Sequence, residues 1–186
     1  SDNGVDYGTI ARRSSTSWTL RTTGRTGHSS GVFGTNLGYG AIYEMARILD
    51  AFRRELPEPN LTYNVGVIGG GTPASIDADG FRVTASGKTN IVAEQAVARG
   101  DIRTLSAEQE ARVRAAMQAI VAQNLPQTQA ELVFAEDGYP PMAPTDGNRA
   151  ILTRLNAVNR DLGLPEMPEY DPARRGAADS SFVAKD

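Results

Sequence analysis

Apolar and polar residues alternate along several stretches of the chain, and this pattern is typical of half-buried β-strands. In the first stretch Trp18 and Leu20 share one face, while Thr19 and Arg21 share the other. The pattern is weaker in residues 91–105, which are predicted to be mostly extended. The candidate strands are residues 15–25, 61–67, 91–105 and 130–135.

Two stretches instead carry apolar residues every three or four positions, the period of an amphipathic helix. The first begins at Asn36, a candidate N-cap, and runs to about Leu56, where Pro57 ends it. The second begins with a capping box at residues 106–109 and ends before Pro126. Both stripes are expected to face a common core.

The order strand, helix, strand, strand, helix, strand predicts an α+β fold, the ferredoxin-like βαββαβ arrangement, over residues 15–136. Its sheet would have four antiparallel strands with both helices on one face, which leaves the other face or an edge for a partner. We interpret Gly69–Thr72 as a turn after a strand and residues 74–89 as a loop or small hairpin.

Residues 137–186 do not belong to this unit, and residues 1–14 are interpreted as a leading linker. A third helix is predicted from Asp146 to Leu162, with Gly163 as a natural residue to follow it. We expect its apolar stripe to pack on the ferredoxin-like domain or on a neighbouring chain. The chain starts without methionine and stops inside an apolar segment, so we expect it to be part of a longer protein.

Composition excludes several classes of function. The net charge of −3 and the lack of basic, aromatic strand surfaces give no support to nucleic acid or an anionic membrane as a partner. The sequence contains no run of about 18 apolar residues, so it predicts no membrane span. The absence of cysteine excludes disulfides and thiol nucleophiles, and leaves cytoplasm and periplasm both open as compartments.

The single histidine, His28, lies in the glycine- and serine-rich stretch GRTGHSSG. Its neighbours bring no apolar surface, so it is either a solvated loop residue or a functional one. It cannot form a zinc site of the usual kind, which needs three or four His, Cys or carboxylate ligands. A Ser–His nucleophile is disfavoured because Ser29 and Ser30 adjoin the ring and no G-x-S-x-G motif is present.

Three further positions are candidates for binding. Asn90 can donate to a carbonyl oxygen, and Arg103 can form a forked pair with a carboxylate. The alternative for both is a turn-capping Asn and a surface Arg. The stretch around Gly176 follows two arginines and is either an anion site or a solvated loop.

Four stretches of the sequence together resemble the di-zinc exopeptidases and amidohydrolases of the carboxypeptidase G, aminoacylase and succinyl-diaminopimelate desuccinylase type. In that family a ferredoxin-like lid, which mediates dimerisation, interrupts a metal-binding catalytic domain. The resemblance implies that residues 15–136 are the lid and that residues 137–186 begin the returning catalytic segment. The stretches are TGRTGHSSG, TYNVGVIGGGTPASI, KTNIVAEQAVARGDIR and RRGAADSSF.

The resemblance also implies roles for individual residues. By motif position His28 is the lid histidine that reaches into the partner subunit's active site and stabilises the oxyanion there. Asn90 and Arg103 match residues that contact substrate, and Gly176 corresponds loosely to the family's glycine-rich loop. The family's zinc ligands and general base have no counterpart here, so two zinc ions are implied for a full-length enzyme and none for this chain, which we expect to be inactive alone.

Two functions follow as hypotheses. The first is the lid of a homodimeric zinc metallopeptidase or amidohydrolase that cleaves an amide bond in a small peptide or an N-acyl amino acid. One departure concerns substrate recognition, because Tyr139-Pro140 stands where carboxypeptidase-like members often carry Arg-Pro. The second is a non-catalytic ferredoxin-like module for protein association or small-ligand sensing.

Overall fold

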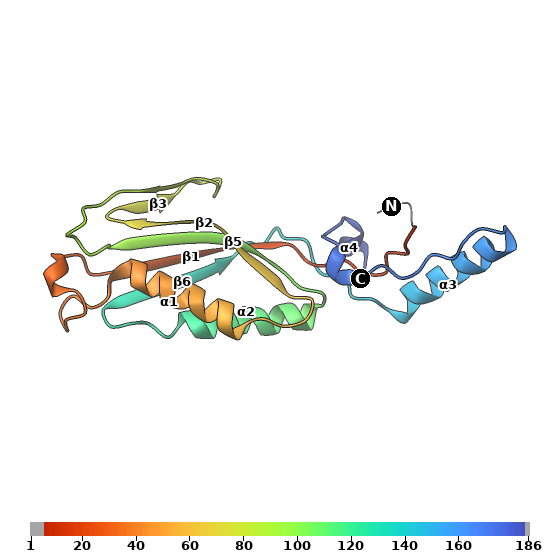
Figure 1. Ribbon diagram of the computed structural model, residues 1–186, viewed down its shortest axis with the longest axis horizontal. Coiled ribbons are helices and arrows are strands. Elements are labelled where there is room, and N and C mark those ends of the chain that lie inside the picture. The colour runs from red at the N-terminus through yellow and green to blue at the C-terminus, as the bar shows by residue number, and fades with distance from the viewer. Residues whose placement is uncertain (1–5, 185–186) are drawn as a thin grey trace.

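A single four-stranded sheet organises the computed structural model, which describes residues 6–184 (Figure 1). The strand order is β2-β5-β1-β6, and every neighbouring pair is antiparallel. The sequence therefore predicted the sheet correctly. We call residues 16–134 the sheet domain; its strands are β1 (Thr16–Gly24), β2 (Thr62–Gly71), β5 (Gln95–Arg103) and β6 (Thr128–Phe134).

Helices α1 (Gly40–Glu55) and α2 (Ala107–Val121) cover one face of this sheet, which confirms the ferredoxin-like α+β fold (Figure 1). Burying the apolar stripes of the helices against alternate strand residues removes both from water, and this is the main stabilising term. Trp18 lies at the centre, with its ring edge-on to Phe52 and the two ring centroids 6.2 Å apart. Both side chains are almost fully buried.

The start of α1 differs from the prediction. The N-cap is Tyr39 rather than Asn36, because Gly38 and Gly40 adopt φ angles of +68° and +76° that keep the preceding chain out of the helix. Leu37 turns away from the helical stripe and packs beneath the loop that carries the histidine. Ser106 is confirmed as the N-cap of α2, since the Gln109 amide donates to its Oγ (3.1 Å). The Gln109 side chain accepts from the Leu105 amide (2.8 Å), one residue before the position that a capping box predicts.

A fully buried carboxylate ties α1 to the loop after α2. Glu44 has no exposed surface, and both of its oxygens accept hydrogen bonds from Arg47, at 2.6 and 3.1 Å. The backbone amide of Leu125 also donates to it (3.0 Å). Arg47 in turn donates to the carbonyl oxygen of Ile120 (3.2 Å). This network fixes the position of α1 relative to the start of β6.

A small hairpin, β3 (Ala74–Ile76) and β4 (Val83–Ala85), lies against the face opposite the helices. Val83 contacts this face at Gly69, where an added Cβ would come within 2.3 Å of the valine methyl group. Gly69–Gly71 belong to β2, so the turn that the sequence predicted at Gly69–Thr72 is wrong for these three residues. The glycine at position 69 instead lets the hairpin approach the strand closely. The hairpin expected within residues 74–89 is confirmed.

The remaining chain forms an extension at one end of the sheet domain (Figure 1). Ser15 and Tyr139 exchange backbone hydrogen bonds at 3.0 and 2.9 Å, and Arg12 and Met142 do the same at 2.9 Å. The incoming and outgoing chains thus leave the sheet domain side by side. The helical elements of the extension are α3 (Asp146–Asp161), the 3-10 turn η2 (Pro172–Arg174) and α4 (Ser180–Val183).

Within this chain α3 does not pack on the sheet domain, which was the first of the two arrangements expected for its apolar stripe. Its Leu152 is buried against Gly8, and Asn148 donates to the carbonyl oxygen of Ile10 (3.0 Å). The paired connections lead α3 away from the sheet (Figure 1), so most of its apolar stripe stays exposed: Ile151, Leu155 and Val158. No helix in residues 6–184 is both long and apolar enough to cross a membrane.

Candidate functional site

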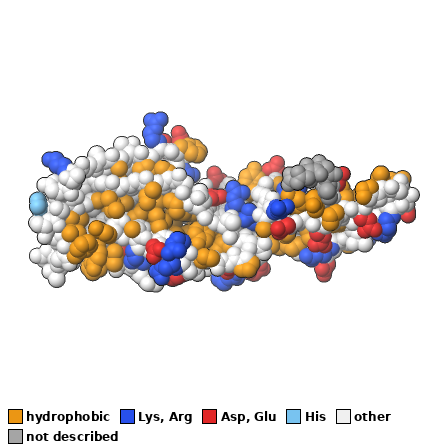
Figure 2. Space-filling view, in the orientation of Figure 1, with side chains coloured by type: hydrophobic (Ala, Val, Ile, Leu, Met, Phe, Trp, Pro, Cys, Tyr) orange, Lys and Arg blue, Asp and Glu red, His pale blue; other side chains and the backbone are white. Residues whose placement is uncertain are grey.

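His28 lies in a loop that continues the pairing of β1 with β5 beyond the end of the sheet. A β-bridge joins His28 to Ile91, and the Ser29 amide donates to the carbonyl oxygen of Asn90 (2.9 Å). The imidazole is exposed at the extreme end of the molecule (pale blue in Figure 2). We call this end, residues 24–39 with 88–93, the tip.

Leu37 lies close to the two glycines beside the histidine, a contact that the sequence did not show. A side chain added at Gly27 would lie 3.1 Å from Leu37 Cδ1, and one at Gly31 would lie 3.4 Å from Leu37 Cδ2. Leu37 therefore fills the space beneath the loop. The loop is supported from below by an apolar residue while its outer side carries the imidazole.

The orientation of the imidazole is set by its own 3-10 turn, η1 (Ser29–Gly31). His28 is the N-cap of this turn, and its Nδ1 accepts a hydrogen bond from the Ser30 amide (3.2 Å). The Ser30 hydroxyl oxygen lies 2.8 Å from the same nitrogen. A nitrogen that accepts from a backbone amide carries no proton, so the neutral ring is protonated at Nε2. His28 is thus arranged to offer an Nε2–H donor.

Two of the substrate-binding candidates, Asn90 and Arg103, lie at opposite ends of the sheet domain. Asn90 is exposed next to His28. Arg103 is the last residue of β5, and its Nε donates to Asp101 Oδ2 (2.8 Å). Because β5 has nine residues at about 3.4 Å each, the two ends are about 27 Å apart.

Arg103 faces the extension, where it meets the fourth candidate. An added Cβ at Gly176 would lie 3.4 Å from Arg103 Nη1. Arg13 is beside them, donating to the carbonyl oxygen of Arg175 (3.3 Å) and to Thr62 Oγ1 (3.0 Å). We call this group of Arg13, Arg103 and residues 175–176 the junction cluster. Arg13 was missed in the sequence because it lies in a polar stretch without a motif.

The structure therefore sorts the four candidates into two pairs. His28 and Asn90 share the tip, and Arg103 and Gly176 share the junction cluster. Arg103 lies beside Arg13 and the backbone of Arg175, and among residues 6–184 the carboxylate that binds its guanidinium is Asp101. The guanidinium groups of Arg13 and Arg103 suit a carboxylate ligand, whereas that of Arg175 lies over the Tyr170 ring, 3.9 Å from its centroid. No single ligand of small size could touch both pairs within one chain.

Phe33, also on the tip, has an uncommon backbone conformation. Its φ angle is +68°, and a bulky side chain held there costs about 1–3 kcal/mol. Its ring is 53% exposed and lies edge-on to Tyr39 and Tyr43, with centroids 5.1 and 5.2 Å away. Nothing in the sequence indicates this conformation, because it is imposed by backbone hydrogen bonds such as the one from the Phe33 amide to Gly38 O (2.7 Å).

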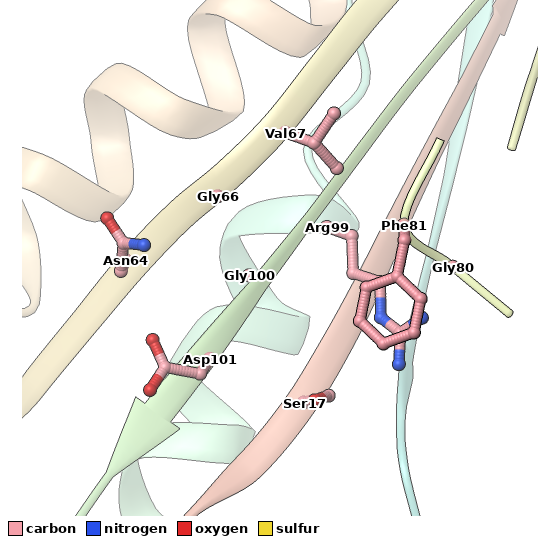
Figure 3. Close-up of a pocket in the computed structure, with 9 residues that line it drawn as sticks. All are labelled: Ser17, Asn64, Gly66, Val67, Gly80, Phe81, Arg99, Gly100 and Asp101. Carbon is pink, nitrogen blue, oxygen red and sulfur yellow. The ribbon is translucent and has the colours of Figure 1, made fainter. Parts of the chain in front are cut away.

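A pocket of about 340 Å³ lies on the sheet face opposite the helices (Figure 3). Its charged groups already have partners. Arg99 lies over the Phe81 ring, 5.8 Å from the centroid, and donates to the carbonyl oxygen of Asp79 (2.9 Å). In the adjoining turn, amide hydrogen bonds, chiefly from Arg82, lower the pKa of Asp77. We interpret these contacts as holding the hairpin on the sheet.

An exposed apolar face combines the edge of the sheet with the side of α1. Ile68 is 55% exposed on β2, and Ile42 is 48% exposed on α1. The two are neighbours, because Ile42 packs against Gly70, which shares a face of β2 with Ile68. Figure 2 shows hydrophobic side chains gathered over this part of the molecule and extending toward the tip. We call Ile42, Val65 and Ile68 the edge face.

The side chains of the described part of the chain do not provide a metal centre. In residues 6–184 no three His, Cys, Asp or Glu side chains gather closely enough to hold an ion. The donor set has one histidine and no cysteine, whereas a catalytic zinc needs about three protein ligands. These residues therefore do not fit a two-zinc site.

Residues 10–129 match the sequence model of the peptidase dimerisation domain. A search of curated protein sequences gave no significant match. Among solved structures, the chain is similar to a tripeptidase from Staphylococcus aureus, with 19% identity and a TM-score of 0.68, over 99% of this chain and 44% of that one.

Two further solved structures have a similar fold. Aminopeptidase PepT from Bacillus cereus has 19% identity and a TM-score of 0.62, over 97% of this chain and 43% of its own. An amidase of the hydantoinase/carbamoylase family from Burkholderia phymatum has 19% identity and a TM-score of 0.60, over 95% and 40%. The chain thus spans less than half the length of these proteins.

Proposed function

Because this chain belongs to the peptidase dimerisation domain family and is homologous to peptidases and amidohydrolases, we propose that it is the dimerising lid of a zinc-dependent amide hydrolase. The tip would complete the active site of a second copy. The substrate would be a small peptide or an N-acyl amino acid whose carboxylate binds at the junction cluster. The observation that carries this proposal is the placement of His28 at the end of the molecule farthest from residues 139–184 (Figures 1 and 2).

The edge face explains how two copies would meet. Within the described residues β2 pairs on one side only, with β5, so its outer backbone groups can accept another strand. Two copies of β2 related by a two-fold axis would pair antiparallel and continue the sheet. An antiparallel arrangement brings the tip of each copy toward the junction cluster of the other.

In this arrangement His28 would donate from Nε2 to the oxygen of the scissile carbonyl. Negative charge develops on that oxygen when water attacks, and a donor already in place stabilises it in the transition state. Asn90 would orient the same carbonyl group by a second hydrogen bond. The metal ions that activate water in such enzymes would need ligands beyond residues 6–184.

Subunit complementation in the longer enzyme tests the proposal. His28→Ala and Arg103→Ala each should be nearly inactive as homodimers. In a mixture that exchanges subunits, half of the dimers are mixed, and each mixed dimer has one site with an intact His28 and an intact Arg103. Activity should therefore return to about a quarter of the wild-type value. A mixture that stays as inactive as its parents would contradict action across the dimer.

Dimerisation itself should depend on the edge face. Ile68→Glu would place an unpaired carboxylate in the contact, so we expect the dimer dissociation constant to rise at least about a hundredfold. Sedimentation equilibrium of this chain measures the change. Val133→Glu is the matched control, because Val133 is similarly exposed on β6 at the opposite edge. If the dissociation constant rises equally in both variants, or rises in neither, the edge face is excluded as the dimer contact.

A further inference from the structure

The aromatic ring of Phe33 is presented by a loop that is fixed from several directions. Arg25 donates to the carbonyl oxygen of Asn36 (2.8 Å), and Gln127 donates to that of Thr35 (3.1 Å). Together with the bond from the Phe33 amide to Gly38, these contacts hold a conformation that phenylalanine otherwise avoids. A strained, half-exposed aromatic residue that its surroundings keep in place is a candidate for contact with a ligand.

Phe33 belongs to the same hydrogen-bonded loop as the histidine. Five residue steps separate it from His28, a reach of at most about 18 Å in a fully extended chain. The intervening 3-10 turn shortens this distance, since the Val32 amide donates back to the carbonyl oxygen of Ser29 (3.1 Å). Phe33 therefore lies less than about 18 Å from His28, a distance that a substrate of a few residues can span.

The aromatic patch is separate from the edge face. Tyr43, against which Phe33 packs, is one residue from Ile42 and so projects about 100° away from it around α1. Arg47, one turn further along the Tyr43 side, reaches the carbonyl oxygen of Ile120 on α2. The patch thus lies on the α2 side of α1, away from the β2 edge.

We propose that Phe33 determines specificity by contacting a large apolar side chain of the substrate in the partner subunit's site. The inference rests on the proposed function, because only a tip that enters a second copy brings Phe33 to a substrate. Phe33 packs edge-on against Tyr39 and Tyr43 and is still 53% exposed, which leaves apolar surface for an aromatic or branched aliphatic group. Glycine or alanine side chains would not reach it.

The test compares substrates of different size in the longer enzyme. Phe33→Asn removes the ring and keeps a residue that tolerates positive φ, so the loop should stay folded. We expect kcat/KM for leucyl- and phenylalanyl-glycine, or for N-acetyl-leucine and N-acetyl-phenylalanine, to fall at least about tenfold. The values for the glycine and alanine analogues should change less than about twofold. Phe81→Ala is the control, since Phe81 is an exposed phenylalanine far from the tip.

The outcomes distinguish this inference from the proposed function. An equal change for small and large substrates, or a weaker dimer with unchanged selectivity, would overturn the role of Phe33 while leaving His28 in place. If His28→Ala hydrolyses every substrate as fast as wild type, the proposed function fails, and the role of Phe33 fails with it. If the wild-type enzyme hydrolyses neither the dipeptides nor the N-acetyl amino acids, the proposed function and the role of Phe33 are both contradicted.

Discussion

Replacing His28 by alanine is expected to lower kcat of the longer enzyme by about a hundredfold to a thousandfold, as for the loss of one oxyanion donor. The effect should appear in kcat more than in KM, because the hydrogen bond strengthens only as charge develops on the oxygen. The side chain is exposed and its contacts lie within its own turn. The variant should therefore melt at the wild-type temperature.

Two companion variants make this measurement specific. His28→Gln keeps an N–H donor near the same place and should recover part of the lost rate. Ser30→Ala keeps the backbone amide that fixes Nδ1 and removes only the hydroxyl, so we expect a much smaller loss than for His28→Ala. Wild-type turnover in His28→Ala would remove the imidazole from the mechanism.

The second large effect concerns folding. Glu44→Ala should lower the free energy of unfolding by about 3 kcal/mol, because it leaves the Leu125 amide and the Arg47 guanidinium without their buried acceptor. Arg47 is partly exposed, so water can replace some of the hydrogen bonds that its guanidinium loses. The expected loss of stability is therefore at the lower end of the range for broken buried ion pairs. Urea denaturation followed by circular dichroism measures it.

Asp50→Ala is the matched control for Glu44 on the same helix. Asp50 also binds arginines, Arg53 and Arg54, but all three side chains are at least half exposed. Exposed ion pairs contribute little, so the denaturation midpoint should hardly move. Glu44→Gln can still accept from Leu125 and should fall between wild type and alanine. A midpoint for Glu44→Ala equal to that of Asp50→Ala would show that the buried network does not stabilise the fold.

The strands and helices could be predicted because each buries one face. Trp18 and Leu20 of β1 and the stripe of α1 follow periods of two and three to four residues, which local geometry requires. The start of α1 could not be predicted in this way. Asn36 is a good capping residue, but the positive φ angles of Gly38 and Gly40 and the packing of Leu37 against Gly27 and Gly31 delay the helix to Gly40.

The candidate site was only partly visible in the sequence. His28, Asn90 and Arg103 were found by their resemblance to a motif, and the roles assigned to them stay predictions. Phe33 and Arg13 carry no such signal. Phe33 is unusual only through a backbone angle that hydrogen bonds of its loop hold in place, among them those from the Phe33 amide to Gly38 and from Gln127 to Thr35. Arg13 becomes notable only because it meets Arg175, 162 residues further along the chain.

By itself the sequence determined the order of the elements, the ferredoxin-like sheet and the family, because these depend on local periodicity and on short motifs. The tertiary structure alone decided which functional candidates lie together. It placed His28 with Asn90 and Arg103 with Gly176, at opposite ends of β5. The physical reason is that an antiparallel sheet brings strand ends together according to register and strand length, and neither quantity can be read from the spacing of single residues along the chain.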